Sequence, residues 1–159
     1  TFMSAQAGIA IEGVIQSDTE PLHRLVSALL EEDAGQVHVL RDPTRGGLAT
    51  TLCEIARSSG VEITIEEERL PIRPAVNTAC EMIGLDPLYL ANEGKMIVIC
   101  DLEGAEELLQ RMRRMPEGRD AALIGWVGER GEGRLSLTTR IGGSRLLEPL
   151  TGQPLPRIC

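Results

Sequence analysis

Aromatic residues are scarce in this sequence, and Phe2, Tyr89 and Trp126 are the complete set. A composition of 42% hydrophobic and 25% charged residues is that of a folded globular domain, whose core must here be aliphatic. So few rings leave no stacking platform for bases, and the net charge of -8 opposes binding to a phosphate backbone. We therefore expect no nucleic-acid partner.

Metal-ligand patterns are also missing. There is no CxxC pair, and the two histidines, His23 and His38, are isolated, so we expect no metal site. Three of the four cysteines lie in apolar runs, where cysteine behaves as a small hydrophobic residue, and we predict that they pack in the core. These are Cys53, Cys80 and Cys100.

The sequence also lacks long apolar runs and targeting patterns. No stretch is long enough to span a membrane and no secretory leader is recognisable, so we predict a cytoplasmic protein with reduced thiols and no membrane partner. The length of 159 residues corresponds to one domain. Because the chain starts with Thr1 in an apolar-rich segment, we expect it to be cut from a longer protein.

Apolar periodicity predicts alternating helices and strands. Helical spacing is found over residues 22–30, 48–59, 75–83 and 102–112. Gly60 and Gly84 are predicted to end the second and third helices, and Asp101 to cap the fourth. Strand patterns are found over residues 36–40, 61–65, 96–100, 121–127 and 135–139. The last two strands flank a glycine-rich stretch and are predicted to form a hairpin.

A first motif, RDPTRGGL, occupies residues 41–48 between a strand and a helix. A helix N-terminus reached through a glycine-rich turn offers unpaired backbone N–H groups and a positive dipole end, which favour an anion such as phosphate. The alternative is that the glycines only let the helix pack closely on a neighbour while Asp42 and Thr44 cap it. The spacing supports both interpretations equally.

A second motif, LDPLYLANEGK, occupies residues 85–95 and leads into the strand at 96–100. Glu93 stands beside Asn92 and Gly94 at the mouth of that strand, where a carboxylate is placed to work as a base. The alternative is a turn in which Glu93 and Lys95 are merely solvated, and the residues by themselves favour it.

The chain ends in PLPRIC, which puts a thiol on the final residue, Cys159. Two prolines lack backbone donors and fix φ, so we expect an extended, poorly paired tail. From Glu148 onward the tail spans on the order of 40 Å if fully extended at ~3.3 Å per residue, enough to carry a chemical group between sites. The alternative is a chain end that happens to be cysteine.

Together, RDPTRGGL at 41–48, LDPLYLANEGK at 85–95 and PRIC at 156–159 resemble the C-terminal half of the HypE family of nickel–iron hydrogenase maturation proteins. The resemblance covers essentially the whole chain. Its first motif is shared in looser form with relatives that make aminoimidazole ribonucleotide, selenophosphate and thiamine diphosphate, whereas the terminal cysteine is far more specific. It implies an α+β fold of α/β layers, a mixed β-sheet with packed helices, like the C-terminal domain of the aminoimidazole ribonucleotide synthetase superfamily.

The resemblance also implies a reaction. In this family the terminal cysteine receives a carbamoyl group, ATP activates the carbamoyl oxygen as a phosphate, and loss of that phosphate with an N–H proton leaves a thiocyanate that supplies cyanide to iron. By motif, Cys159 is the acceptor and nucleophile, Glu93 is the base and Asn92 positions the carbamoyl group. The phosphate side of the cleft is then formed by the first motif: Arg41, Asp42, Thr44, Arg45, Gly46 and Gly47.

Cofactors and partners follow from the same resemblance. ATP and Mg2+ are expected to bind mainly through an N-terminal domain that is absent from this chain, so the chain alone is expected to be inactive. The carbamoyltransferase HypF and the HypC–HypD iron scaffold are the implied partners, and the full-length protein is expected to be a homodimer. The expected organisation is an α/β domain over residues 1–147 and a flexible tail over residues 148–159.

The sequence departs from the family pattern at Cys53, where family members often carry asparagine. Two other functions stay open. The chain could be a non-catalytic interaction module that presents Cys159 to maturation partners, which differs from an enzyme in ATP-dependent turnover. It could instead be another phosphoryl-transfer member of the superfamily, whose activity would be indifferent to replacement of Cys159.

Overall fold

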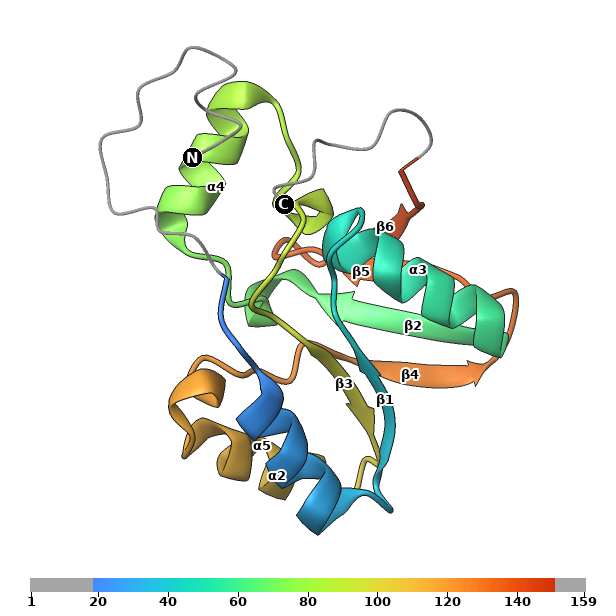
Figure 1. The fold of residues 1–159 in the computed structure, drawn as a ribbon. Coiled ribbons are helices and arrows are strands. Elements are labelled where there is room, and N and C mark those ends of the chain that lie inside the picture. The colour runs from blue at the N-terminus through green and yellow to red at the C-terminus, as the bar shows by residue number, and fades with distance from the viewer. Residues whose placement is uncertain (1–18, 151–159) are drawn as a thin grey trace.

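The computed structural model describes residues 19–150 and has two packed regions (Figure 1). In the region that we call the sheet region, α3 and the short helix η2 pack with a four-stranded sheet of order β4-β2-β5-β6. In the ribbon region, α2 and α5 pack on an antiparallel pair, β1 and β3. The helices are α2 His23–Asp33, α3 Gly47–Ser59, η1 Glu67–Arg69, α4 Pro74–Ile83, η2 Pro87–Tyr89, α5 Ala105–Arg113 and η3 Pro116–Gly118. The strands are β1 Val37–Arg41, β2 Val61–Glu66, β3 Ile97–Cys100, β4 Gly125–Arg130, β5 Leu135–Thr138 and β6 Ser144–Leu147.

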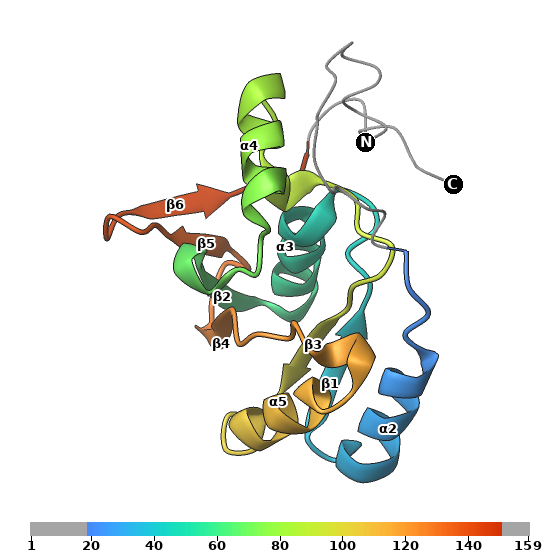
Figure 2. The same cartoon turned by 90° about the vertical axis from the view of Figure 1, so that its left-hand side faces the viewer.

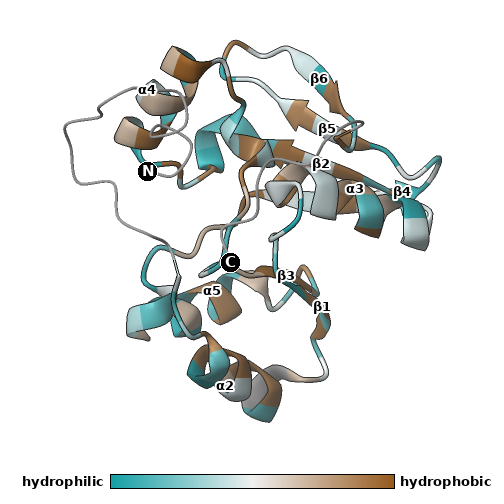
Figure 3. Cartoon of the chain, turned by 45° about the horizontal axis from the view of Figure 1, so that its top comes forward, coloured by the Kyte–Doolittle hydropathy of each residue, from teal (hydrophilic) through white to brown (hydrophobic). Residues whose placement is uncertain are grey.

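The core of the sheet region lies between α3 and the sheet. Strands β2 and β5 alternate buried and half-buried residues, and their inward members Ile65 and Leu135 are almost fully buried. Facing them, α3 presents Leu52, Cys53 and Ala56 at helical spacing. Figure 3 shows the hydrophobic colour on the strands beneath α3, whereas the outer end of β4 is hydrophilic.

The core of the ribbon region is smaller. Leu25 and Leu29 of α2 meet Leu108 of α5, and half-buried residues of the ribbon and three methionines surround them. Figure 2 shows α2 and α5 at the end of the molecule opposite α4. No helix in the described residues 19–150 is long and apolar enough to cross a membrane.

The predicted helices and their glycine stops are confirmed. Gly60 and Gly84 adopt left-handed backbone after α3 and α4, with φ of 63° and 70°. The predicted cap of the last helix is wrong, because α5 begins at Ala105 after a turn. Asp101 instead pairs with His38 across the ribbon at 2.7 Å.

The predicted hairpin between residues 121–127 and 135–139 is also wrong. Strand β2 lies between β4 and β5, antiparallel to the first and parallel to the second. Ile63 of β2 thus stands opposite both Val127 and Leu135, so β4 and β5 pair with β2 and not with each other. The hairpin that does form joins β5 to β6, a strand missing from the sequence prediction.

The fold class is confirmed as α+β, with helices packed on a mixed sheet. The ribbon of β1 and β3 adds a second, separate sheet to the predicted one. Strand β1 leads out of the ribbon region into the first motif, and the second motif leads back into β3 (Figure 1).

Candidate functional site

The first motif turns sharply into α3. Gly46 and Gly47 have φ of 71° and 64°, a left-handed backbone that glycine adopts without strain. The helix has no side-chain cap, so the proposed capping by Asp42 and Thr44 does not occur, and its first turn carries no acidic residue. The N-terminus of α3 therefore keeps its positive dipole end uncompensated by a carboxylate of that turn.

The second glycine of the motif lets two segments touch. A Cβ added to Gly47 would lie 2.5 Å from the carbonyl oxygens of both Leu88 and Leu90. No side chain fits in this space, so η2 packs directly on the start of α3. The close-packing interpretation of the glycines is thus confirmed, and the anion interpretation stays a prediction.

A backbone hydrogen bond joins the two motifs further. The N–H of Asn92 donates to the carbonyl of Pro43 at 3.1 Å, and the side-chain amide of Asn92 donates to Leu90 at 2.8 Å. Glu93 follows immediately and is exposed, as is Lys95. The fold therefore brings Asn92 and Glu93 to the loop of the first motif, although they are 45 or more residues apart in sequence.

The charged residues of the first motif point to the surface. Arg41, Asp42 and Arg45 are exposed, and Thr44 is half-buried. Arg41 forms a 3.3 Å ion pair with Glu54 of α3, in which both side chains are more than half exposed. Arg45 has no such ion pair in the described part of the chain, so it is the motif's cation available to an anion.

The end of β6 and the residues that follow it are held against α3 and η2, and we call residues 145–150 the strap. Arg145 donates to the carboxylate of Asp86 at 2.9 Å, and the hydroxyl of Tyr89 donates to the carbonyl of Glu148 at 2.8 Å. The carboxylate of Glu148 also pairs with Arg57 of α3. Burial, and then the carboxylate of Asp86, raises the pKa of Tyr89, so its hydroxyl remains a donor.

The strap runs toward the start of α3. Its carbonyl at Leu147 accepts from the thiol of Cys53 at 3.3 Å, and the N–H of Leu150 lies 3.4 Å from the hydroxyl oxygen of Thr50. A Cβ on Gly46 would strike that same threonine. The last described residue of the chain therefore lies beside the glycine turn. The predicted acceptor, Cys159, lies outside the described residues.

Cys53 has a structural role. It is 2% exposed, and burial raises the pKa of its thiol to about 11 despite the opposing charge of Arg57. The thiol is therefore protonated at neutral pH and donates to the strap. Core packing is confirmed for Cys53 and Cys80, whereas Cys100 is half-buried beside the ribbon core.

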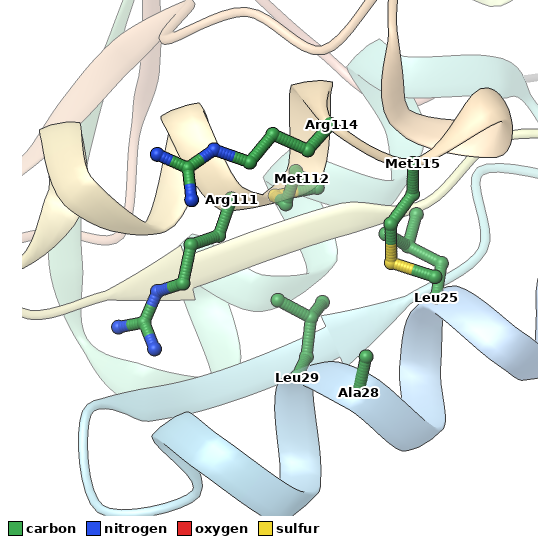
Figure 4. Close-up of a pocket in the computed structure, with 7 residues that line it drawn as sticks. All are labelled: Leu25, Ala28, Leu29, Arg111, Met112, Arg114 and Met115. Carbon is green, nitrogen blue, oxygen red and sulfur yellow. The ribbon is translucent and has the colours of Figure 1, made fainter.

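Two hollows lie away from the motifs. One lies between α2 and α5 and is lined by Leu29, Met112, Arg111 and their neighbours (Figure 4). Another is lined by residues 71–73, Arg113 and residues 119–122. Neither hollow includes a predicted site residue. Over residues 19–150, no three His, Cys, Asp or Glu side chains are grouped to hold a metal ion.

Sequence reasoning missed the residues that hold the strap. Tyr89 and Asp86 belong to the second motif, but nothing in the motif indicates that they bind a segment 59 residues further on. Arg57 and Thr50 lie on α3 as ordinary polar residues of an amphipathic helix. Among these residues only Tyr89 stands out in the sequence, because it is the single tyrosine.

Comparison with known proteins agrees with this architecture. Residues 1–138 match the family model described as AIR synthase related protein, C-terminal domain. The chain therefore belongs to the AIR synthase related family and corresponds to the C-terminal domain of its members.

Within that family, the chain is similar to HypE. It is 49% identical over 159 residues to the carbamoyl dehydratase HypE of Azotobacter vinelandii, a match that covers 100% of this chain and 46% of that protein. The predicted resemblance to the C-terminal half of HypE is confirmed. The chain spans about half the length of the relatives that it matches.

Solved structures give the same result. A crystal structure of hydrogenase maturation protein HypE superposes with a TM-score of 0.91 at 46% identity, covering 100% of this chain and 51% of that one. HypE in complex with ATP superposes with a TM-score of 0.89 at 45% identity, over 100% and 48% of the two chains. HypE from a HypE–HypF complex superposes with a TM-score of 0.85 at 40% identity, over 93% and 48%.

Proposed function

We propose that this chain is the acceptor-bearing part of a carbamoyl dehydratase in nickel–iron hydrogenase maturation. Cys159 carries the carbamoyl group, and the surface formed by the two motifs performs the dehydration. The observation that supports this most is the convergence of three segments: the glycine turn, Asn92 with Glu93, and the strap that ends at Leu150 beside Thr50. From Leu150 the remaining residues reach at most about 30 Å, so the thiol can return to this surface.

The chemistry needs two groups near one amide. The carbamoyl oxygen attacks the terminal phosphorus of ATP, ADP leaves, and an N–H proton is lost, which gives an S-bound carbonimidic phosphate. The remaining N–H proton then passes to the base as the C–O bond breaks, so that inorganic phosphate leaves and S–C≡N remains. Glu93 is the base in this proposal, because it is an exposed carboxylate next to the turn.

The surface suits the phosphate side of that reaction. The start of α3 offers a positive dipole end without an acidic residue in its first turn, and Arg45 and the N–H groups near Gly47 flank it. Arg41 and Thr44 border the same turn, and Asn92 orients the carbamoyl amide. That a HypE structure has been solved with ATP supports ATP as the phosphoryl donor.

Mg2+ is proposed to bind mainly outside this chain. Among residues 19–150, no three His, Cys, Asp or Glu side chains are grouped to hold a cation. We propose that the half of the relatives which this chain does not span supplies most of the nucleotide site, and that the complete protein is a homodimer. The chain alone is then inactive.

Partners follow from the acceptor role. HypF is proposed as the carbamoyl donor, which the solved HypE–HypF complex supports. The HypC–HypD scaffold is proposed as the recipient of the cyano group. These steps take place in the cytoplasm in our proposal.

Intact mass of the C-terminal peptide tests the proposal. The chain is combined with the missing half, HypF, carbamoyl phosphate, and ATP with magnesium. We expect a carbamoyl adduct on Cys159 that converts to a nitrile only with ATP. If the peptide stays unmodified while ATP is consumed, the chain is another phosphoryl-transfer member. A carbamoyl adduct that never dehydrates would favour an interaction module.

A further inference from the structure

The two parts of the second motif contact different segments of the chain. Asp86 and Tyr89, in its first part, bind the strap through Arg145 and the Glu148 carbonyl. Asn92, in its second part, binds the first motif. The DPLY sequence thus attaches the C-terminal segment in addition to packing on the start of α3.

The attachment continues past the end of β6. Glu148 is held twice, by Tyr89 through its carbonyl and by Arg57 through its carboxylate. Leu150 then reaches Thr50, one helical turn from Gly46. Without these contacts the chain would leave the fold at Leu147, which is 3% exposed and fixed in the core by its strand.

We propose that Tyr89 and Arg57 are positioning residues for Cys159. By holding Glu148, they extend the fixed part of the chain from Leu147 to at least Leu150, the last described residue, at the edge of the glycine turn. The connection from this fixed part to Cys159 then has nine residues instead of twelve. In the flexible tail that we propose, the probability of close approach falls roughly as the −3/2 power of connection length, so release lowers it about 1.5-fold by length alone. The inference rests on the proposed role of Cys159 as the group that returns to this surface.

Paramagnetic relaxation tests the inference without ATP or a carbamoyl donor. A nitroxide is attached to Cys159 in a Cys100→Ser background, since Cys53 and Cys80 are buried. Amide relaxation is then measured in the whole chain. We expect the enhancement at residues 44–47 and 92–95 to fall at least about 1.5-fold in the double variant Tyr89→Phe/Arg57→Gln. Insertion of Gly-Ser-Gly after Leu150 should produce the same fall with the holding contacts intact.

Arg24→Gln is the matched control. Arg24 is 68% exposed, and its ion pair with Glu117 joins α2 to η3 in the ribbon region, so its loss should leave the enhancements unchanged. The inference is overturned if the double variant behaves like wild type, or if the control falls equally. Because the relaxation assay involves no chemistry, the expected fall in the double variant, combined with failed dehydration in the mass assay, would refute the proposed function and leave the positioning role standing.

Discussion

The sheet region and the ribbon region differ in what their polar residues do. Around α3, polar side chains donate to backbone carbonyls of the second motif and the strap: Cys53 to Leu147, Tyr89 to Glu148 and Asn92 to Leu90. Around α2 and α5, an apolar cluster of leucines and methionines supplies the packing, and its hollow is open to solvent. Residues of the two motifs thus have a packing role as well as a proposed chemical one. Substitutions in the sheet region should therefore affect chemistry or stability, whereas those in the ribbon region should affect stability alone.

The largest effect expected in the sheet region is on chemistry. Glu93→Gln should slow nitrile formation by about 10^2- to 10^4-fold, the contribution of a general base, and leave carbamoylation of Cys159 intact. The matched control is Glu103→Gln, an exposed glutamate next to α5. Mass spectrometry should find accumulated carbamoyl-cysteine only in the first variant. Undiminished dehydration would rule Glu93 out as the base.

The next effect is on the junction of the two motifs. Gly47→Ala should lower the free energy of unfolding by about 3 kcal/mol, because it adds a steric clash with two carbonyls to the strain of a left-handed backbone. Gly60→Ala isolates the strain, since Gly60 has nearly the same φ, 63°, and nothing within 4 Å of an added Cβ. It should lose only about 1 kcal/mol in urea unfolding. Equal losses would contradict the close packing of η2 on α3.

In the ribbon region, truncation should affect stability and leave the chemistry unchanged. Leu29→Ala removes a side chain that is 3% exposed and should lower the free energy of unfolding by about 2.5 kcal/mol. This loss lies near the low end of the range for truncating a buried leucine to alanine, because the neighbouring hollow lets the surrounding side chains relax. Below the unfolding transition, the dehydration rate should match wild type. A loss of dehydration rate as large as that of Glu93→Gln would contradict the separate roles of the two regions.

The last expected effect concerns pH and is absent at neutral pH. Burial raises the pKa of the Cys53 thiol from 9.0 in the unfolded chain to about 11 in the folded one. The buried neutral thiol therefore contributes its full stability below pH 9, and that contribution is lost as pH rises through 11. At 1.36 kcal/mol per pKa unit, the loss is about 3 kcal/mol. Denaturant unfolding of wild type and Cys53→Ala should show the stability difference narrowing over this interval, and a constant difference would contradict the burial of an uncharged thiol.

Local patterns predicted the helices well, because periodicity and glycine stops are properties of neighbouring residues. Gly60 and Gly84 end α3 and α4 as expected. Strand order was not predictable in the same way. Placing β2 between β4 and β5 depends on pairing between residues 60 or more positions apart. A glycine-rich stretch between two strands predicts a hairpin whether or not the strands pair.

The site was predictable only in part for the same reason. Both motifs stand out in the sequence, but their contact through Gly47, and the hydrogen bond of Asn92 to Pro43, arise from tertiary packing. The holding of Glu148 by Tyr89 and Arg57 has no sequence signature, because a single tyrosine and an exposed arginine fit many roles.

The central claim is that the motif surface of the sheet region, and not the ribbon region, binds the reacting groups. Amide chemical shifts test it most directly when a non-hydrolysable ATP analogue is added to the labelled chain together with the missing half. We predict analogue-dependent shifts at residues 44–47 and 92–95, and none at residues 25–29 or 108–115. Shifts confined to the second set, beside the hollow between α2 and α5, would contradict the account.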